Sequence, residues 1–162
     1  MQFDDDDDDP FDWDEFERNY DPEEAQREHE AEKRRIEKLP VLRKANEILD
    51  ITEAIVSTID QEKDVLMMHE QMLGNAMMLA PKIVGAEGGD LYSVRMENAV
   101  IIRMHARELL TQTTYCKVEE LADEDHLELL RQELETFRRL FVDWVKTFDK
   151  SNDYPDEWGV FI

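Results

Sequence analysis

The sequence predicts an all-α protein built on an antiparallel, up-down-up-down four-helix bundle. Four stretches carry apolar residues at alternating spacings of three and four, which is the period of one buried helix face. Proline, glycine and short polar segments separate these stretches. No run of alternating β-branched residues competes with the helical pattern. Because the connections are short, consecutive helices are expected to pack as antiparallel neighbours.

The composition favours a single domain with charged tails. At 162 residues the chain is long enough to bury a core without disulfides or metals. Its formal net charge is −22, from 41 acids against 19 bases. This charge disfavours a protein that coats DNA or RNA, because phosphate binding needs clustered Lys and Arg. No direct contact with nucleic acid is therefore expected.

The cysteine count and the hydropathy favour a cytoplasmic location. Cys116 is the only cysteine, so no intrachain disulfide can form and a reducing compartment is expected. The N-terminus is acidic where a secretory signal is basic and then apolar. No apolar run approaches the ~18 residues of a membrane span. The sequence thus predicts a soluble cytoplasmic protein without membrane contact.

The N-terminal segment is an acidic arm that also carries aromatic residues. Residues 1–24 contain 13 acids and one base, a net charge of −12. Like charges at this density oppose collapse, so residues 1–21 are expected to be disordered in isolation. A helix is predicted over 22–39, since Pro22 suits a first helical turn and acids precede bases. It has almost no apolar stripe and is expected to be solvated.

The bundle itself is predicted within residues 40–149. Pro40 opens its first helix, and the polar segment DQEKD (60–64) separates this helix from the second. Pro81 is expected to kink the second helix or restart its last turn. The residues predicted to face the core are Leu42, Ala45, Ile48, Leu49, Thr52, Ile55, Val56 and Ile59 in the first helix, and Val65, Met68, Met72, Ala76, Leu79 and Ile83 in the second.

The third and fourth helices follow the glycine-rich segment GAEGG (85–89). Asp90 is expected to cap the third helix at its N-terminus. The fourth helix has the longest stripe, which predicts packing on other helices at a shallow angle. Residues 150–162 form an acidic, aromatic tail. The predicted inward residues are Val94, Ile101, Ile102, Leu109 and Leu110, then Leu127, Leu130, Leu134, Phe137, Phe141, Trp144 and Phe148.

Three motifs carry a family resemblance over residues 40–149. They are NAMMLAPKIVGAEGG (75–89), the segment ARELL (106–110) in the third helix, and the heptad stripe of the fourth helix. Their order resembles small bacterial four-helix-bundle proteins, a family that includes the ribosomal intervening-sequence proteins and the accessory subunit of diversity-generating retroelements. The resemblance implies an antiparallel bundle, ring-like homo-oligomers and, in some members, nucleic-acid contact through basic surfaces. The acidity of this chain departs from that last property.

No residue set predicts catalysis. His69 and His105 lie on or beside apolar stripes and could be imagined as metal ligands with Glu70 and Glu108. The repeated Glu-x-x-His motif of di-metal bundles is absent, so we interpret them as core-edge histidines that hydrogen-bond a neighbour. Cys116 lies near a helix C-terminus, where the macrodipole disfavours a thiolate. No catalytic residue, metal site or cofactor is predicted, and GAEGG is interpreted as a loop.

The second helix is unusually rich in methionine. These residues lie on more than one of its faces, and methionine adapts both to cores and to partner-binding surfaces. We interpret this helix as buried on two sides, by the bundle and by another subunit. An exposed apolar groove for a different partner stays the alternative. The methionines are Met67, Met68, Met72, Met77 and Met78.

The third helix also carries a candidate contact for anions. Arg95, Arg103 and Arg107 occur along it, and clustered arginines are suited to binding acidic groups. Ion pairing with acids on a solvated helix face is the alternative, because such pairs contribute only a few tenths of a kcal/mol and need no partner.

The arm provides the leading functional hypothesis. DDDDPF (6–11) resembles the acidic tip of bacterial single-stranded-DNA-binding proteins, in which a terminal Phe enters an apolar pocket rimmed by basic residues. Acids supply long-range steering, while Phe11, Trp13 and Phe16 supply apolar area. We therefore predict a non-enzymatic, self-associating interaction protein whose arm docks on a basic surface, either of another protein or of its own bundle. The alternatives are an acidic mimic of nucleic acid and a metal-dependent bundle enzyme.

Overall fold

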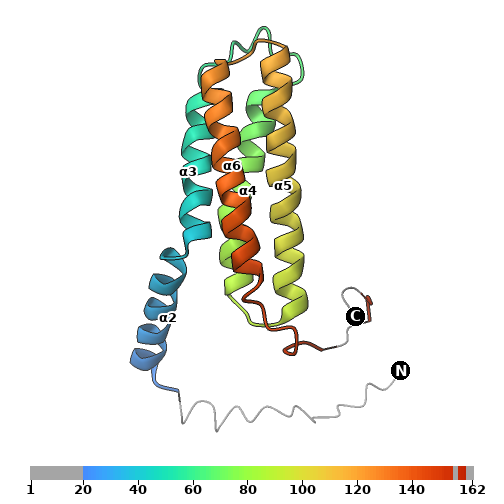
Figure 1. Cartoon of the computed structure of the whole chain (residues 1–162). Coiled ribbons are helices and arrows are strands. Elements are labelled where there is room, and N and C mark those ends of the chain that lie inside the picture. Colours follow the sequence, from blue (N-terminus) through green and yellow to red (C-terminus); the bar gives the residue numbers. More distant parts are fainter. Residues whose placement is uncertain (1–19, 155–156, 160–162) are drawn as a thin grey trace, which may run out of the picture. The chain divides into compact units, whose positions relative to one another are not determined.

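The computed structural model describes residues 20–154 and 157–159, and these contain five helices and no strand (Figure 1). The prediction of an all-α protein is confirmed for this part of the chain. The chain divides into two compact units, residues 1–35 and 36–162. The helices are α2 (Pro22–Glu37), α3 (Pro40–Val56), α4 (Met68–Glu87), α5 (Tyr92–Val118) and α6 (Glu124–Val145).

Helix α2 is charged and solvated along most of its length. The Asp21 carboxylate accepts a hydrogen bond of 2.9 Å from the Glu23 amide and so caps the N-terminus. Acidic residues occupy its first turn and Arg34 and Arg35 its last, as the helix macrodipole favours. Ile36 is the only buried residue of α2, because its sequence has almost no apolar stripe to bury.

Helices α3 to α6 run side by side in the second unit (Figure 1). Helices α3 and α5 each pack against both α4 and α6, so every one of the four has two neighbours. Their facing stripes meet in one apolar core, since each amphipathic helix must bury its apolar face. The largest fully buried side chains include Ile48 of α3, Met72 and Leu79 of α4, Ile102 and Leu109 of α5, and Leu130 and Phe137 of α6.

Helix α4 begins three residues later than predicted. Its first residue is Met68, and Met67 before it has a left-handed backbone with φ of 54°. Residues 65–67 therefore lie in the loop, and Val65 is 83% exposed although it was expected to face the core. The helix continues through Pro81 to Glu87, and Gly88 then caps it, so the predicted stop at GAEGG is confirmed.

The buried face of α5 is more polar than its sequence pattern suggested. It runs through Ala99, Ile102, Leu109, Gln112, Thr113 and Cys116. Val94 and Leu110 were predicted to face inward but are 42% and 37% exposed. An apolar-only pattern misses this face because small and amide side chains occupy part of it.

The N-terminus of α5 is capped from the far end of the chain. The prediction that Asp90 caps it is wrong: the N-cap position is Leu91, whose side chain cannot accept a hydrogen bond. The Tyr92 amide instead donates to the Asn152 carbonyl at 2.8 Å, and the Ser93 amide to Asp153 Oδ2 at 3.1 Å. Residues 152–153 thus satisfy amides that a helix start leaves unpaired, and hold this part of the tail on the bundle.

Candidate functional site

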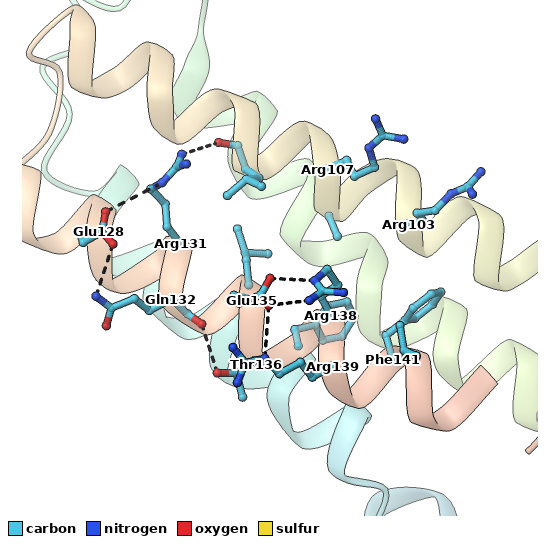
Figure 2. Close-up of a pocket in the computed structure, with 15 residues that line it drawn as sticks. Arg103, Arg107, Glu128, Arg131, Gln132, Glu135, Thr136, Arg138, Arg139 and Phe141 are labelled. Atoms are coloured by element: carbon cyan, nitrogen blue, oxygen red, sulfur yellow. Dashed lines mark hydrogen bonds and ion pairs between the residues drawn. The ribbon is translucent and has the colours of Figure 1, made fainter. Parts of the chain in front are cut away.

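A groove of about 790 Å³ lies between α5 and α6 (Figure 2). Part of its lining is apolar, because α6 turns the edge of its long stripe toward the groove and α5 contributes residues beside its buried face. The apolar lining residues are Ala106, Leu110, Leu134, Phe137, Phe141 and Val142. The rest of the lining is polar or charged, and it consists of Glu128, Glu135, Gln132, Thr136 and the five arginines Arg103, Arg107, Arg131, Arg138 and Arg139.

The groove carries a positive charge within a strongly acidic protein. Its five arginines and two glutamates give it a formal charge of +3, against −22 for the whole chain. At physiological salt, charges further than about 8 Å away are largely screened. A ligand in the groove is therefore governed mainly by these nearby cations.

The arginines of α6 are held by neighbouring side chains. Glu135 accepts hydrogen bonds from Arg138 at 2.6 and 2.8 Å and from Arg139 at 3.3 Å. The hydrogen bond from Arg138, reinforced by Arg139, lowers the pKa of Glu135 to about 2. Arg131 donates to Thr113 Oγ1 at 2.9 Å and to Thr114 Oγ1 at 3.0 Å, which ties α6 to α5.

Arg103 and Arg107 differ from these three arginines. Both are exposed, and neither makes an ion pair with any residue that the structure describes. In Figure 2 no dashed line reaches either guanidinium, and both residues border the groove. They are therefore cations available to an acidic ligand.

The predicted patch of Arg95, Arg103 and Arg107 does not form as one surface. Arg95 is absent from the groove lining and donates instead to the Glu87 carboxylate. Its guanidinium also lies 4.1 Å from the centre of the Phe148 ring, a cation–π contact. The Arg95 side chain is only 14% exposed, because it belongs to a buried cluster between the end of α4 and the end of α6.

Sequence reasoning missed the contribution of α6 to the groove. None of Arg131, Arg138 and Arg139 was predicted to line a binding surface. A signal did exist, since positions 131, 135, 138, 139 and 142 follow helical spacing along one edge of the apolar stripe. The sequence does not show that α5 packs beside this edge, so the groove could not be predicted from the spacing alone.

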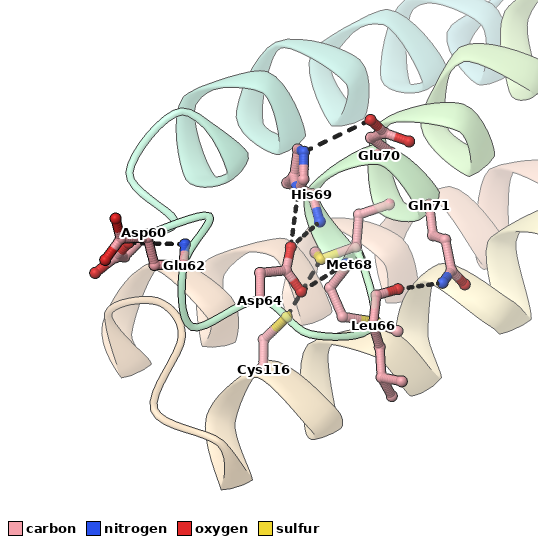
Figure 3. A network of polar contacts seen from close by, with 10 residues as sticks. Asp60, Glu62, Asp64, Leu66, Met68, His69, Glu70, Gln71 and Cys116 are labelled. Atoms are coloured by element: carbon pink, nitrogen blue, oxygen red, sulfur yellow. Dashed lines mark hydrogen bonds and ion pairs between the residues drawn. The ribbon is translucent and has the colours of Figure 1, made fainter.

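The two histidines lie in separate hydrogen-bond networks. His69 Nδ1 lies 2.6 Å from Asp64 Oδ2 (Figure 3), whereas His105 Nδ1 lies 2.7 Å from Asn75 Oδ1. Asn75 in turn donates to Gln112 at 3.0 Å. The prediction that each histidine hydrogen-bonds a neighbour is confirmed. Within residues 20–154 and 157–159, no three or more His, Cys, Asp or Glu side chains are grouped so as to hold a metal ion.

Asp64 organises the start of α4. Its buried carboxylate accepts hydrogen bonds from the amides of Met68 at 2.7 Å and His69 at 2.9 Å (Figure 3). Burial raises the pKa of Asp64, but the hydrogen bonds from both His69 groups and from Met68 outweigh it, so the pKa lies below its ordinary value. The carboxylate thus serves as a helix cap from a position in the preceding loop.

Cys116 is buried at the end of α5, with its Sγ 3.5 Å from Met72 Sδ. Burial, and to a lesser degree the charge of Asp64, raises the pKa of the thiol to about 11. The thiolate is the reactive form, so at pH 8 we expect Cys116 to react with an aromatic disulfide reagent only as fast as the protein opens. The measurement is the labelling rate in native and denaturing buffer. A native rate equal to the denatured rate would contradict this expectation.

The methionines of α4 divide between core and surface. Met68 and Met72 are buried, Met78 is partly buried, and Met77 is 53% exposed. Met67 lies in the preceding loop and is 49% exposed. The bundle therefore covers one side of α4 and leaves apolar area on another.

Over the residues that the structure describes, the protein is all-helical and has a basic, partly apolar groove between α5 and α6. Comparison of the sequence with protein-family models and with curated proteins finds no match. The family resemblance therefore rests on the three motifs described above. Within the described residues, no helix is both long and apolar enough to cross a membrane. The predicted binding residues Phe11, Trp13 and Phe16 lie outside the described residues.

Proposed function

We propose that this protein is a non-enzymatic helical-bundle interaction protein, which self-associates and binds basic, apolar surfaces through its acidic arm, residues 1–21. One observation carries the proposal: the chain contains two elements of opposite charge, each combined with apolar side chains. The arm holds 11 acids, one base and five aromatic residues. The groove between α5 and α6 holds five arginines beside Leu134, Phe137 and Phe141.

Charge and apolar area act at different stages of such an interaction. Complementary charge accelerates encounter and excludes partners of like charge. Buried aromatic side chains then supply most of the affinity and slow dissociation. A protein that carries both elements is suited to reversible, salt-sensitive association, which fits a recruiting role better than a permanent assembly.

The proposal includes the finer architecture. Helices α3 to α6 would alternate in direction, as in an up-down-up-down bundle, and α2 would be an addition to that bundle. The short connections at 57–67, 88–91 and 119–123 support this arrangement. The cytoplasm is the proposed location, since the single cysteine suits a reducing compartment.

Light scattering tests the self-association. We would measure the mass of the full-length chain and of a variant lacking residues 1–21, each at 50 mM and 500 mM salt. Deletion of the arm leaves Ile36 in place and so spares the core. We expect the full-length protein to form a larger species at low salt, and both the deletion and high salt to reduce its mass.

A matched control separates charge from length. In this variant Asp4 to Asp9 become asparagine, which keeps the arm and its aromatic residues but removes six charges. We expect an intermediate mass. If all three proteins show one mass at both salts, the arm does not drive self-association and the proposal fails. If that one mass is the mass of an oligomer, assembly occurs through the bundle, and the face of α4 that carries Met77 is the first surface to mutate.

A further inference from the structure

We propose that the groove between α5 and α6 is the docking site for the acidic arm of a second copy of this chain. The inference rests on the proposed function and adds the surface that the arm binds. Three properties of the groove select this occupant: its charge, its apolar lining and its length.

The charge of the groove matches the arm. Arg103 and Arg107 are exposed cations with no ion-pair partner among the residues that the structure describes. Arg138 and Arg139 share a single carboxylate, Glu135, so this group also keeps an excess positive charge. Docked aspartates can accept charge-assisted hydrogen bonds from these guanidinium groups, which are stronger than neutral ones.

The apolar lining explains why the ligand needs aromatic residues. Phe137 and Phe141 line the groove, with their ring centres 6.2 Å apart. Phe137 is only 2% exposed and forms the floor of the groove, whereas Phe141 is partly exposed, so an additional ring can pack on Phe141 in an edge-to-face or offset arrangement. Phe11, Trp13 and Phe16 supply rings among the acids of the arm.

The lengths of groove and arm agree. The lining residues of α6 extend from Glu128 to Val142, which is about 21 Å at the helical rise. Residues 11–16 span about 17 Å in an extended conformation. Because side chains alternate between the two faces of an extended segment, Phe11 and Trp13 can enter the groove together while Phe16 lies on the opposite face, and the aspartates of 4–9 continue past the end of the groove.

Helix α2 favours binding of the arm to the groove of a second molecule over binding to the groove of its own chain. It places a helix of 16 residues, about 24 Å long, between the arm and the bundle. Its exposed charges keep it solvated, and Ile36 at its end is its only buried residue. A stiff spacer lowers the effective concentration of the arm at a groove of its own chain, whereas it does not hinder the groove of a neighbour.

Two full-length variants test the docking, one on each side of the contact. R103E/R107E reverses the two free cations of the groove, and F11A/W13A/F16A removes the rings of the arm. The control R43E/K63E makes the same charge change at two exposed bases outside the groove. We expect each test variant to weaken self-association at least about tenfold by sedimentation, and the control to leave it unchanged.

Mixing the two variants identifies the source of the arm. The groove of F11A/W13A/F16A and the arm of R103E/R107E are both intact, so the mixture should form a 1:1 heterodimer that neither variant forms alone. If the mixture stays monomeric although each variant has lost self-association, an intact arm does not bind the intact groove of another molecule, and the second-copy assignment is overturned.

Each failure has a distinct meaning. If R103E/R107E associates as the wild type does while deletion of residues 1–21 abolishes association, the proposed function stands and the groove assignment is wrong. If the arm deletion itself changes nothing, both proposals fail. If R43E/K63E weakens association as much as R103E/R107E, net charge and not the groove is responsible, which also overturns the assignment.

Discussion

Replacing Glu87 by alanine is expected to lower the free energy of unfolding by about 3 to 5 kcal/mol, because it leaves a buried cation without its partner. The Glu87 side chain is 4% exposed and accepts from the Arg95 guanidinium and, at 2.7 Å, from Trp144 Nε1. Without the carboxylate, both donors stay buried and lose a hydrogen bond. Arg95 cannot escape the penalty by deprotonation, since arginine stays charged in proteins.

Urea unfolding measures this effect, with Glu135→Ala as the matched control. Glu135 also pairs with arginines, but its side chain is 44% exposed, so water can replace its contacts. We expect the Glu87 variant to unfold at much lower urea and the Glu135 variant to stay close to the wild type. Glu87→Gln should fall between them, since it keeps an acceptor for Trp144 but loses the charge. Equal midpoints for the two alanine variants would contradict a buried Glu87 cluster.

Replacing Asp64 by asparagine is expected to lower the free energy of unfolding by about 2 kcal/mol near pH 7. The carboxylate accepts from the amides of Met68 and His69 and from the His69 ring, and its side chain is fully buried. An asparagine side chain offers one acceptor in place of two and turns an NH₂ group toward these donors. The start of α4 should be the region most affected.

The stabilisation that Asp64 provides is expected to fall as the pH is lowered. The folded protein holds the pKa of Asp64 below the ordinary value of about 3.9, so the carboxylate stabilises the fold above that value. As the pH falls through the folded pKa, Asp64 becomes protonated in both states and its contribution disappears. The difference in unfolding free energy between wild type and Asp64→Asn should therefore be larger at pH 5 than at pH 3 and shrink as the pH falls below 4. A difference independent of pH down to 2.5 would contradict the role of the charge.

The buried faces of α3 and α6 could be predicted from the sequence, because each depends on the spacing of residues that are close in the chain. All seven positions predicted to face inward in the fourth helix are buried or partly buried, six of them in α6 and Phe148 just beyond its end, and Phe141 is the least covered of them. In α3 the buried face includes Leu42, Ala45 and Ile48 as predicted. A spacing of three and four residues places side chains on one helix face whatever packs against it, so this information is local.

Helix boundaries were less predictable where a distant group supplied the cap. The sequence indicated Asp90 for α5, yet the amides there are satisfied by residues 152–153, about 60 residues further along the chain. The start of α4 was placed at Val65, three residues too early, because the Asp64 carboxylate reaches past the loop to the amides of Met68 and His69. Cap preferences concern the residue next to the helix start, so they do not predict either arrangement.

By itself, the sequence determined an all-α protein, its four long amphipathic helices, the acidity of the arm and the absence of an intrachain disulfide. The tertiary structure decided which charges meet. It buried Glu87 against Trp144, 57 residues away, and separated Arg95 from Arg103 and Arg107. It also joined those two arginines to three from α6 in one groove. Helical periodicity arises from neighbours in the chain, whereas the local charge of a surface depends on which helices pack side by side.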